Sequence, residues 1–215
     1  GTNLNSLEGR GFLENILRYL NSNTAGAVAQ ALETNPSLLR EVVGNLSAET
    51  GQRMAEATND AVAIAESEGR KSLMQVLMEN MAPATAQALA EGLNQSAAQN
   101  PGFLTALLVN LDEETGKAVG RGLNAMAVGE GSSAFFQVLD ITLGSTQAHT
   151  LSAITGALET PQGKAFLNAL LSNLDAAALG AGVNAGIDAA PSHFLRNNLA
   201  ATDADMMARI TRGVG

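Results

Sequence analysis

Two histidines, His149 and His193, are the side chains of this sequence that could act as a general base near neutral pH or bind a transition metal. Either role would need a partner close by, such as a second histidine one helical turn away or an orienting carboxylate. The sequence has no His-x-x-x-His or Glu-x-x-His pair, and it has no cysteine. We therefore expect ordinary surface or helix-end roles for both histidines, and we predict no catalytic or metal-binding residue.

Other short motifs also favour structural explanations. The glycine-rich stretch 129–133 lacks the lysine of a phosphate-binding loop, so a connection between two helices is favoured. The acid pairs Glu113–Glu114 and Asp203–Asp205 fall at expected helix starts, where they complement the helix dipole, and no spaced calcium loop surrounds them. An enzyme would need several of the scattered carboxylates to converge in a cleft. Because no Gly-x-Ser-x-Gly sequence occurs either, we expect a non-enzymatic protein without a cofactor.

Asparagine recurs in two columns along the repeat that is described below. The first column, near the ends of expected second helices, consists of Asn59, Asn94, Asn124 and Asn184. It resembles the repeated asparagines with which armadillo-like solenoids hold an extended peptide, so these four are the candidate binding residues. The second column, at the ends of expected first helices, consists of Asn45, Asn80, Asn110 and Asn173. Helix capping is the alternative for both, and especially for the second, because a Leu or Met follows each Asn as in a Schellman closure with a left-handed Asn.

The elements that position these residues come from an internal repeat. An apolar pair, a second apolar pair four residues on, and then a polar residue and a leucine-like residue return along the chain, most clearly in the stretch 103–111. The copies begin at Phe12, Leu38, Leu73, Phe103, Phe135, Phe166 and Phe194. Within each copy, this spacing is typical of a helix with a broad buried stripe. A second helix rich in alanine and glycine follows, which predicts that neighbouring helix axes approach closely.

Proline and short polar residues mark the expected helix starts. Ser47, Asp112 and Asp175 are the predicted N-caps of second helices. The tail of the second copy, residues 60–69, either lengthens its second helix or forms an acidic loop. All five prolines fall at expected helix starts: Pro36, Pro83, Pro101, Pro161 and Pro191.

Together these features predict an all-α protein, a right-handed α-solenoid of about seven helix-turn-helix repeats of roughly 30 residues each. In such an array neighbouring hairpins stack side by side. The arrangement resembles HEAT and tetratricopeptide solenoids in class only, since the residue signature of the latter is missing and the unit is shorter than in the former. We expect residues 1–11 to be a leader or N-terminal cap and residues 12–215 to form a single helical-repeat domain.

Composition excludes several classes of partner. The net charge is −9 and the twelve basic residues are scattered, so nucleic acid is not an expected partner. No apolar run approaches the roughly 20 residues of a membrane span. The chain opens with Gly1-Thr2-Asn3 and contains only three lysines, with many Asn, Ser and Thr. These features do not fix the compartment, although they lean towards an exported or cell-envelope protein.

Two functions are consistent with this pattern. The first is a non-enzymatic scaffold or binding module for a protein or peptide partner, with self-association as a further possibility. The alternative is a carrier that holds an elongated apolar ligand or lipid between its helices, which requires an apolar tunnel. The seven methionines fit either an adaptable groove or plain core filling, and at helical spacing the second is the more common.

Overall fold

The computed structural model describes residues 5–19, 34–129 and 132–189, together with residues 24, 27, 28, 30 and 31. These residues are helical apart from short turns, and no strand occurs among them, as predicted. The predicted seventh copy, with His193 and Phe194, lies outside them, as do Asp203 and Asp205. The helices are α1 (Leu7–Tyr19), α3 (Pro36–Gly44), α4 (Ala48–Ser67), α5 (Leu73–Glu79), α6 (Pro83–Gln99), α7 (Gly102–Asn110), α8 (Glu113–Val128), α9 (Ser132–Ser145), α10 (Ala148–Leu158), α11 (Pro161–Ser172) and α12 (Ala176–Ala189).

The helices begin where the capping residues predict. The Ser47 hydroxyl accepts a hydrogen bond from the Thr50 N–H at 3.2 Å, and the Asp112 carboxylate accepts one from the Thr115 N–H at 2.8 Å. Asp175 caps α12 in the same way. Proline opens α3, α6 and α11, because its missing N–H has no partner in a first turn in any case. The tail of the second copy continues α4 as helix, so the acidic-loop alternative is wrong.

The helix-end asparagines work differently from the prediction. No described residue other than glycine has a positive φ, so Asn45, Asn80, Asn110 and Asn173 do not adopt the left-handed conformation. Instead, the Nδ2 of each donates to the carbonyl four residues earlier, at 2.7 to 2.8 Å. The side chain thus satisfies one of the carbonyls left open at the helix end. Only Gly69, after α4, takes the left-handed turn among the described residues, with φ of 64°.

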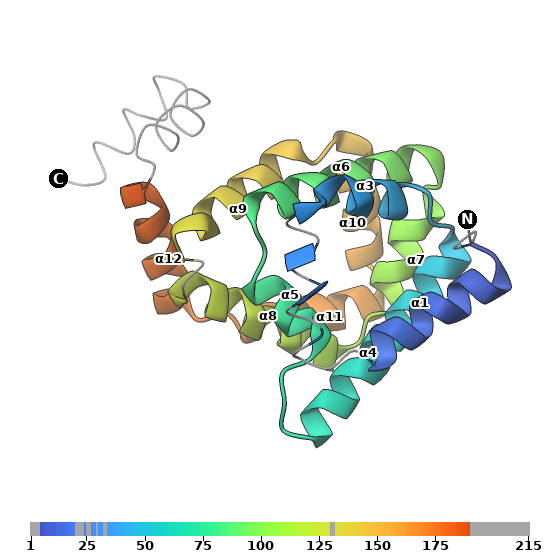
Figure 1. Ribbon diagram of the computed structural model, residues 1–215, viewed down its shortest axis with the longest axis horizontal. Helices are drawn as coiled ribbons and strands as arrows, with labels where there is room; N and C mark the ends of the chain where they lie inside the picture. Colours follow the sequence, from blue (N-terminus) through green and yellow to red (C-terminus); the bar gives the residue numbers. More distant parts are fainter. Residues whose placement is uncertain are drawn as a thin grey trace.

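Each helix packs mainly on the helix three places further along the chain, and this packing differs from the predicted stacking of neighbouring hairpins. The main pairs are α1 with α4, α3 with α6, α4 with α7, α5 with α8, α6 with α9, α7 with α10, α8 with α11 and α9 with α12. Figure 1 shows the result as three sides: α3, α6 and α9 along the top, α1, α4 and α7 on the right, and α5, α8 and α11 below.

The turns explain why the two helices of a predicted hairpin do not lie against each other. The residues between them are extended: Leu111 and Asp112, between α7 and α8, have ψ of 136° and 176°. An extended pair turns the chain through a corner instead of folding it back, and α12 continues at 73° to α11. Successive corners bring the chain round until it meets the helix three places earlier. The predicted boundary between a leader and a repeat domain, at residues 11 and 12, falls inside α1.

Glycine allows the stacked helices to touch. A Cβ on Gly116 of α8 would lie 2.5 Å from the Phe166 carbonyl oxygen of α11, and one on Gly51 of α4 would lie equally close to the Phe103 carbonyl oxygen of α7. Real Cβ atoms do not approach a backbone oxygen so closely, so these positions require glycine at this helix separation. The predicted close approach of the helices is confirmed at these contacts.

No single helix among the described residues has the length and apolar character to cross a membrane. Within the same part of the chain, the bent pair formed by α11 and the first part of α12 reaches that length and apolar character together.

Candidate functional site

Three asparagines of the first column hold the turns of the fold. Asn94, on α6, is 8% exposed and reaches the corner between α9 and α10. Its Nδ2 donates to the Ser145 carbonyl at 2.7 Å, and its Oδ1 accepts from the Gln147 N–H at 3.0 Å and from the Thr150 hydroxyl at 2.8 Å. One amide therefore fixes the corner and the first turn of the next helix. We call this three-bond arrangement the asparagine clasp.

The clasp recurs at three further corners among the described residues. Asn59 makes the same three bonds to Asn110, Asp112 and Thr115. Asn5, which precedes α1, makes them to the corner between α3 and α4. Asn124 makes only two, to Asn173 and Asp175, because the position that threonine occupies in the other corners is alanine.

These contacts account for three of the four candidate binding residues. The side-chain amides of Asn59, Asn94 and Asn124 are occupied by partners within the fold. Holding a helix corner therefore explains the recurrence of these asparagines better than peptide binding does. Asn184, on α12, is exposed and clasps no turn among the described residues. The column can be recognised from the sequence alone, and the signal that could have identified its partner is the threonine three residues after each of Ser47, Asp112 and Gln147.

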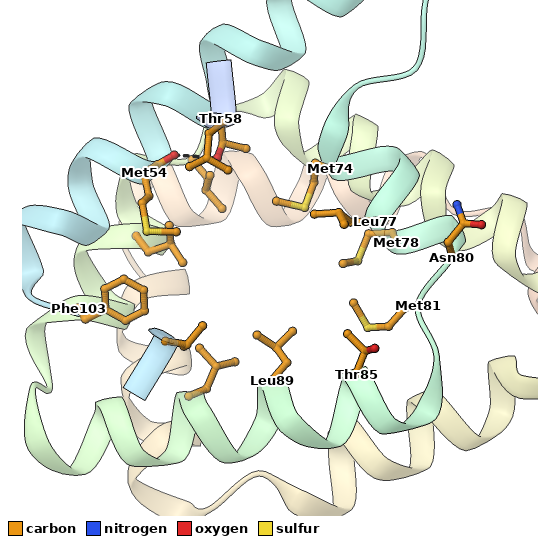
Figure 2. Close-up of a pocket in the computed structure, with 15 residues that line it drawn as sticks. Met54, Thr58, Met74, Leu77, Met78, Asn80, Met81, Thr85, Leu89 and Phe103 are labelled. Carbon is orange, nitrogen blue, oxygen red and sulfur yellow. Dashed lines mark hydrogen bonds between the residues drawn. The ribbon is translucent and has the colours of Figure 1, made fainter. Parts of the chain in front are cut away.

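The structure contains an apolar cavity that no single motif predicted. Its volume is about 290 Å³, and it lies between α4 and α5 on one side and α6 on the other, as Figure 2 shows. Thr85, Leu89 and Leu93 of α6 line the cavity at four-residue spacing, so they lie on one face of the helix. At the rise of an α-helix, these residues form a wall about 12 Å long. The other walls come from helices far apart in the sequence, and their residues are Leu17, Val43, Met54, Thr58, Met74, Leu77, Met78, Asn80, Met81, Phe103, Leu107 and Leu111.

Three polar side chains line the cavity, those of Thr58, Asn80 and Thr85, and the first two have partners in the backbone of their own helices. The Thr58 hydroxyl donates to the Met54 carbonyl at 2.7 Å, and the Asn80 Nδ2 donates to the Val76 carbonyl at 2.8 Å. No lining residue carries a charge. The cavity therefore offers a bound molecule apolar contact rather than ionic recognition.

Methionine gives the cavity wall its flexibility. Met54, Met74, Met78 and Met81 all line it, and Figure 2 shows the last three directing their thioethers into the open space. Unbranched methionine side chains adapt to ligands of differing shape better than leucine or valine does. Met126, in contrast, is 1% exposed and packs in a separate apolar cluster, as the core-filling interpretation of methionine predicts.

The titratable groups whose pKa values are shifted are not among the cavity-lining residues. Hydrogen bonds from Gln87 and Arg40 hold the pKa of the Glu91 carboxyl below its usual value. The neighbouring Glu114 carboxylate raises the pKa of the Lys117 amine. His149 has its Nε2 3.0 Å from the Asn94 carbonyl oxygen, next to a clasp. Among the described residues, no group of three or more His, Asp or Glu side chains is placed to hold a metal ion.

Comparison of the chain with protein-family models, with curated proteins and with solved structures finds no significant match.

Proposed function

We propose that the protein is a non-enzymatic helical-repeat binding protein whose central cavity holds an elongated apolar ligand. The observation that carries the proposal is the composition of the cavity wall, which is predominantly apolar, uncharged and rich in methionine. A cavity of about 290 Å³ is close to the lower end of the range for small-molecule sites, about 300 to 1,000 Å³. An apolar cavity of this kind gains binding energy by removing hydrocarbon from water.

The proposal includes an α-solenoid, the class of fold that the sequence predicts, although its repeating unit differs from the predicted two-helix hairpin. The packing of each helix on the one three places later supports a superhelix with three helices in each turn, in which the asparagine clasps connect one turn to the next. The right-handed sense and the number of about seven repeats remain predictions.

Calorimetric titration with 1-octanol and with naphthalene tests the binding function. We expect one molecule to bind per chain. The variant Leu89→Trp, which fills the middle of the α6 wall, should lose most of this binding. Leu171→Trp is the matched control, because Leu171 is 53% exposed and is not a lining residue. Absence of binding of both probes to the wild-type protein would contradict the proposal.

A scaffold for a protein or peptide partner is the second candidate. It is favoured by α1, where Phe12 is 56% exposed and Ile16, one helical turn later on the same face, is 37% exposed. Exposed apolar side chains that lie together can mark an interaction surface, including one for self-association. Sedimentation velocity of the wild-type protein and of Phe12→Asp tests the self-association form. A concentration-dependent oligomer that the substitution abolishes would support this candidate, and a monomer at all concentrations would oppose self-association through α1.

A further inference from the structure

The shape of the cavity and the difference between its two ends point to a more specific ligand class, and this step rests on the binding function proposed above. We infer that the cavity takes a single unbranched alkyl chain of about ten to twelve carbons, inserted apolar end first, with its polar end left beside Asn80.

The size of the chain follows from the volume. An apolar cavity of about 150 Å³ accommodates benzene, which has six carbon atoms. By proportion, about 290 Å³ corresponds to about twelve carbons. The wall along α6 from Thr85 to Leu93 is about 12 Å long, so this volume is elongated along the helix rather than rounded. An extended chain matches that form better than a compact ring system of the same carbon count.

The orientation follows from how buried the two ends are. Phe103, at one end, is 1% exposed and shares a buried cluster with Val43, which is 8% exposed, whereas Asn80, at the other end, is exposed. In Figure 2 Phe103 and Asn80 lie at opposite ends of the space. A hydroxyl or carboxylate pushed against Phe103 would lose its water without gaining a partner, which is unfavourable. The polar end therefore stays at the Asn80 end, where water is available.

The head group should contribute little to affinity. No lining residue is charged, and the lining amide of Asn80 already donates to a backbone carbonyl. Discrimination among ligands should come from the length of the alkyl chain and from the apolar end of the ligand. Acids, alcohols and esters with the same alkyl chain therefore belong to one ligand class.

A calorimetric series of 1-alkanols from hexanol to hexadecanol on the full chain tests the inference. Each added methylene should lower the Kd about four-fold, and the gain should level off at about ten to twelve carbons. At matched carbon count, 1-decanol should bind more tightly than naphthalene. The diol 1,10-decanediol, whose second hydroxyl must enter the closed end, should bind about ten-fold or more weakly than 1-decanol.

The outcomes separate this inference from the binding function. Binding of naphthalene as tight as that of 1-decanol, a Kd that does not depend on chain length, or equal affinity for the diol would overturn the alkyl-chain assignment while leaving an apolar binding site in place. Failure of every probe to bind the wild-type protein would overturn both. Leu89→Trp and Leu171→Trp serve again as the blocking variant and its control, and loss of binding in both would indicate a general loss of structure.

Discussion

The asparagine clasp permits a quantitative test of how the fold is held together. In Asn94→Ala, three hydrogen bonds disappear: to the Ser145 carbonyl, the Gln147 N–H and the Thr150 hydroxyl. At about 1 kcal/mol net for each bond, the substitution should lower the free energy of unfolding by about 3 kcal/mol. Thr150 is only 1% exposed, so its stranded hydroxyl should add a further cost of about 1 kcal/mol.

The chain supplies matched controls for this value. Asn124→Ala removes a clasp of two bonds, so its effect should be about 2 kcal/mol. Asn184→Ala changes an exposed residue that clasps no described turn, and its effect should stay within about 0.5 kcal/mol. Thr150→Val should recover part of the loss in Asn94→Ala, because the stranded hydroxyl is then absent.

Urea unfolding followed by far-ultraviolet circular dichroism measures all of these variants. The predicted order of destabilisation is Asn94→Ala, then Asn124→Ala, then Asn184→Ala. Equal effects at the three positions, or a loss below about 0.5 kcal/mol for Asn94→Ala, would refute the structural role of the clasp.

Two further predictions concern helix contacts. Gly116→Ala should destabilise the protein by about 1 to 3 kcal/mol, because the new Cβ would meet the Phe166 carbonyl oxygen. Gly180→Ala should stabilise α12 by about 0.5 to 1 kcal/mol, because no atom lies within 4 Å of the new Cβ. Thermal melts of the two variants test the pair, and a shift of the same sign in both would contradict the account. The Glu91–Arg40 ion pair should contribute about 0.5 kcal/mol or less, because both side chains are over two-fifths exposed. The pKa of Glu91 is lower in the folded protein than in the unfolded chain. The stabilisation by the ion pair is therefore fully present above the ordinary carboxyl pKa, and it is lost as the pH falls through the lowered pKa of the folded state. Unfolding of Glu91→Gln across that pH range checks the sign, since the difference from wild type should vanish at the acidic end.

Local features of the sequence determined the helices well. Proline at the start of α3, α6 and α11 and the N-caps Ser47 and Asp112 stand where the capping rules place them. These signals are short-range, because each depends on a residue and the backbone of the next turn. The asparagine at each helix end was also recognised, although it bonds back to the preceding turn instead of adopting the left-handed conformation.

The packing of the helices could not be predicted from the repeat. The repeat shows that each unit has a buried face, but it does not show which other unit covers that face. The extended residues at the corners, such as Leu111, decide that the partner lies three helices away. Contacts between positions about 50 residues apart, such as Asn59 with Asn110, then become possible.

The cavity depends on those same long-range contacts. Met74, Met78 and Met81 are spaced to face one side of a helix, which core filling would explain equally well. A space remains between the side chains only because α4, which carries Met54, and α6, which carries Leu89, lie opposite these methionines. No local pattern in the sequence contains that information.

The most direct test of the account is a crystal structure of the protein soaked with 1-decanol. The account predicts density for one extended chain along α6, with its methyl end near Phe103 and its hydroxyl near Asn80. At saturating 1-decanol, a cavity closed by its own side chains, with no density for the alcohol, would contradict it.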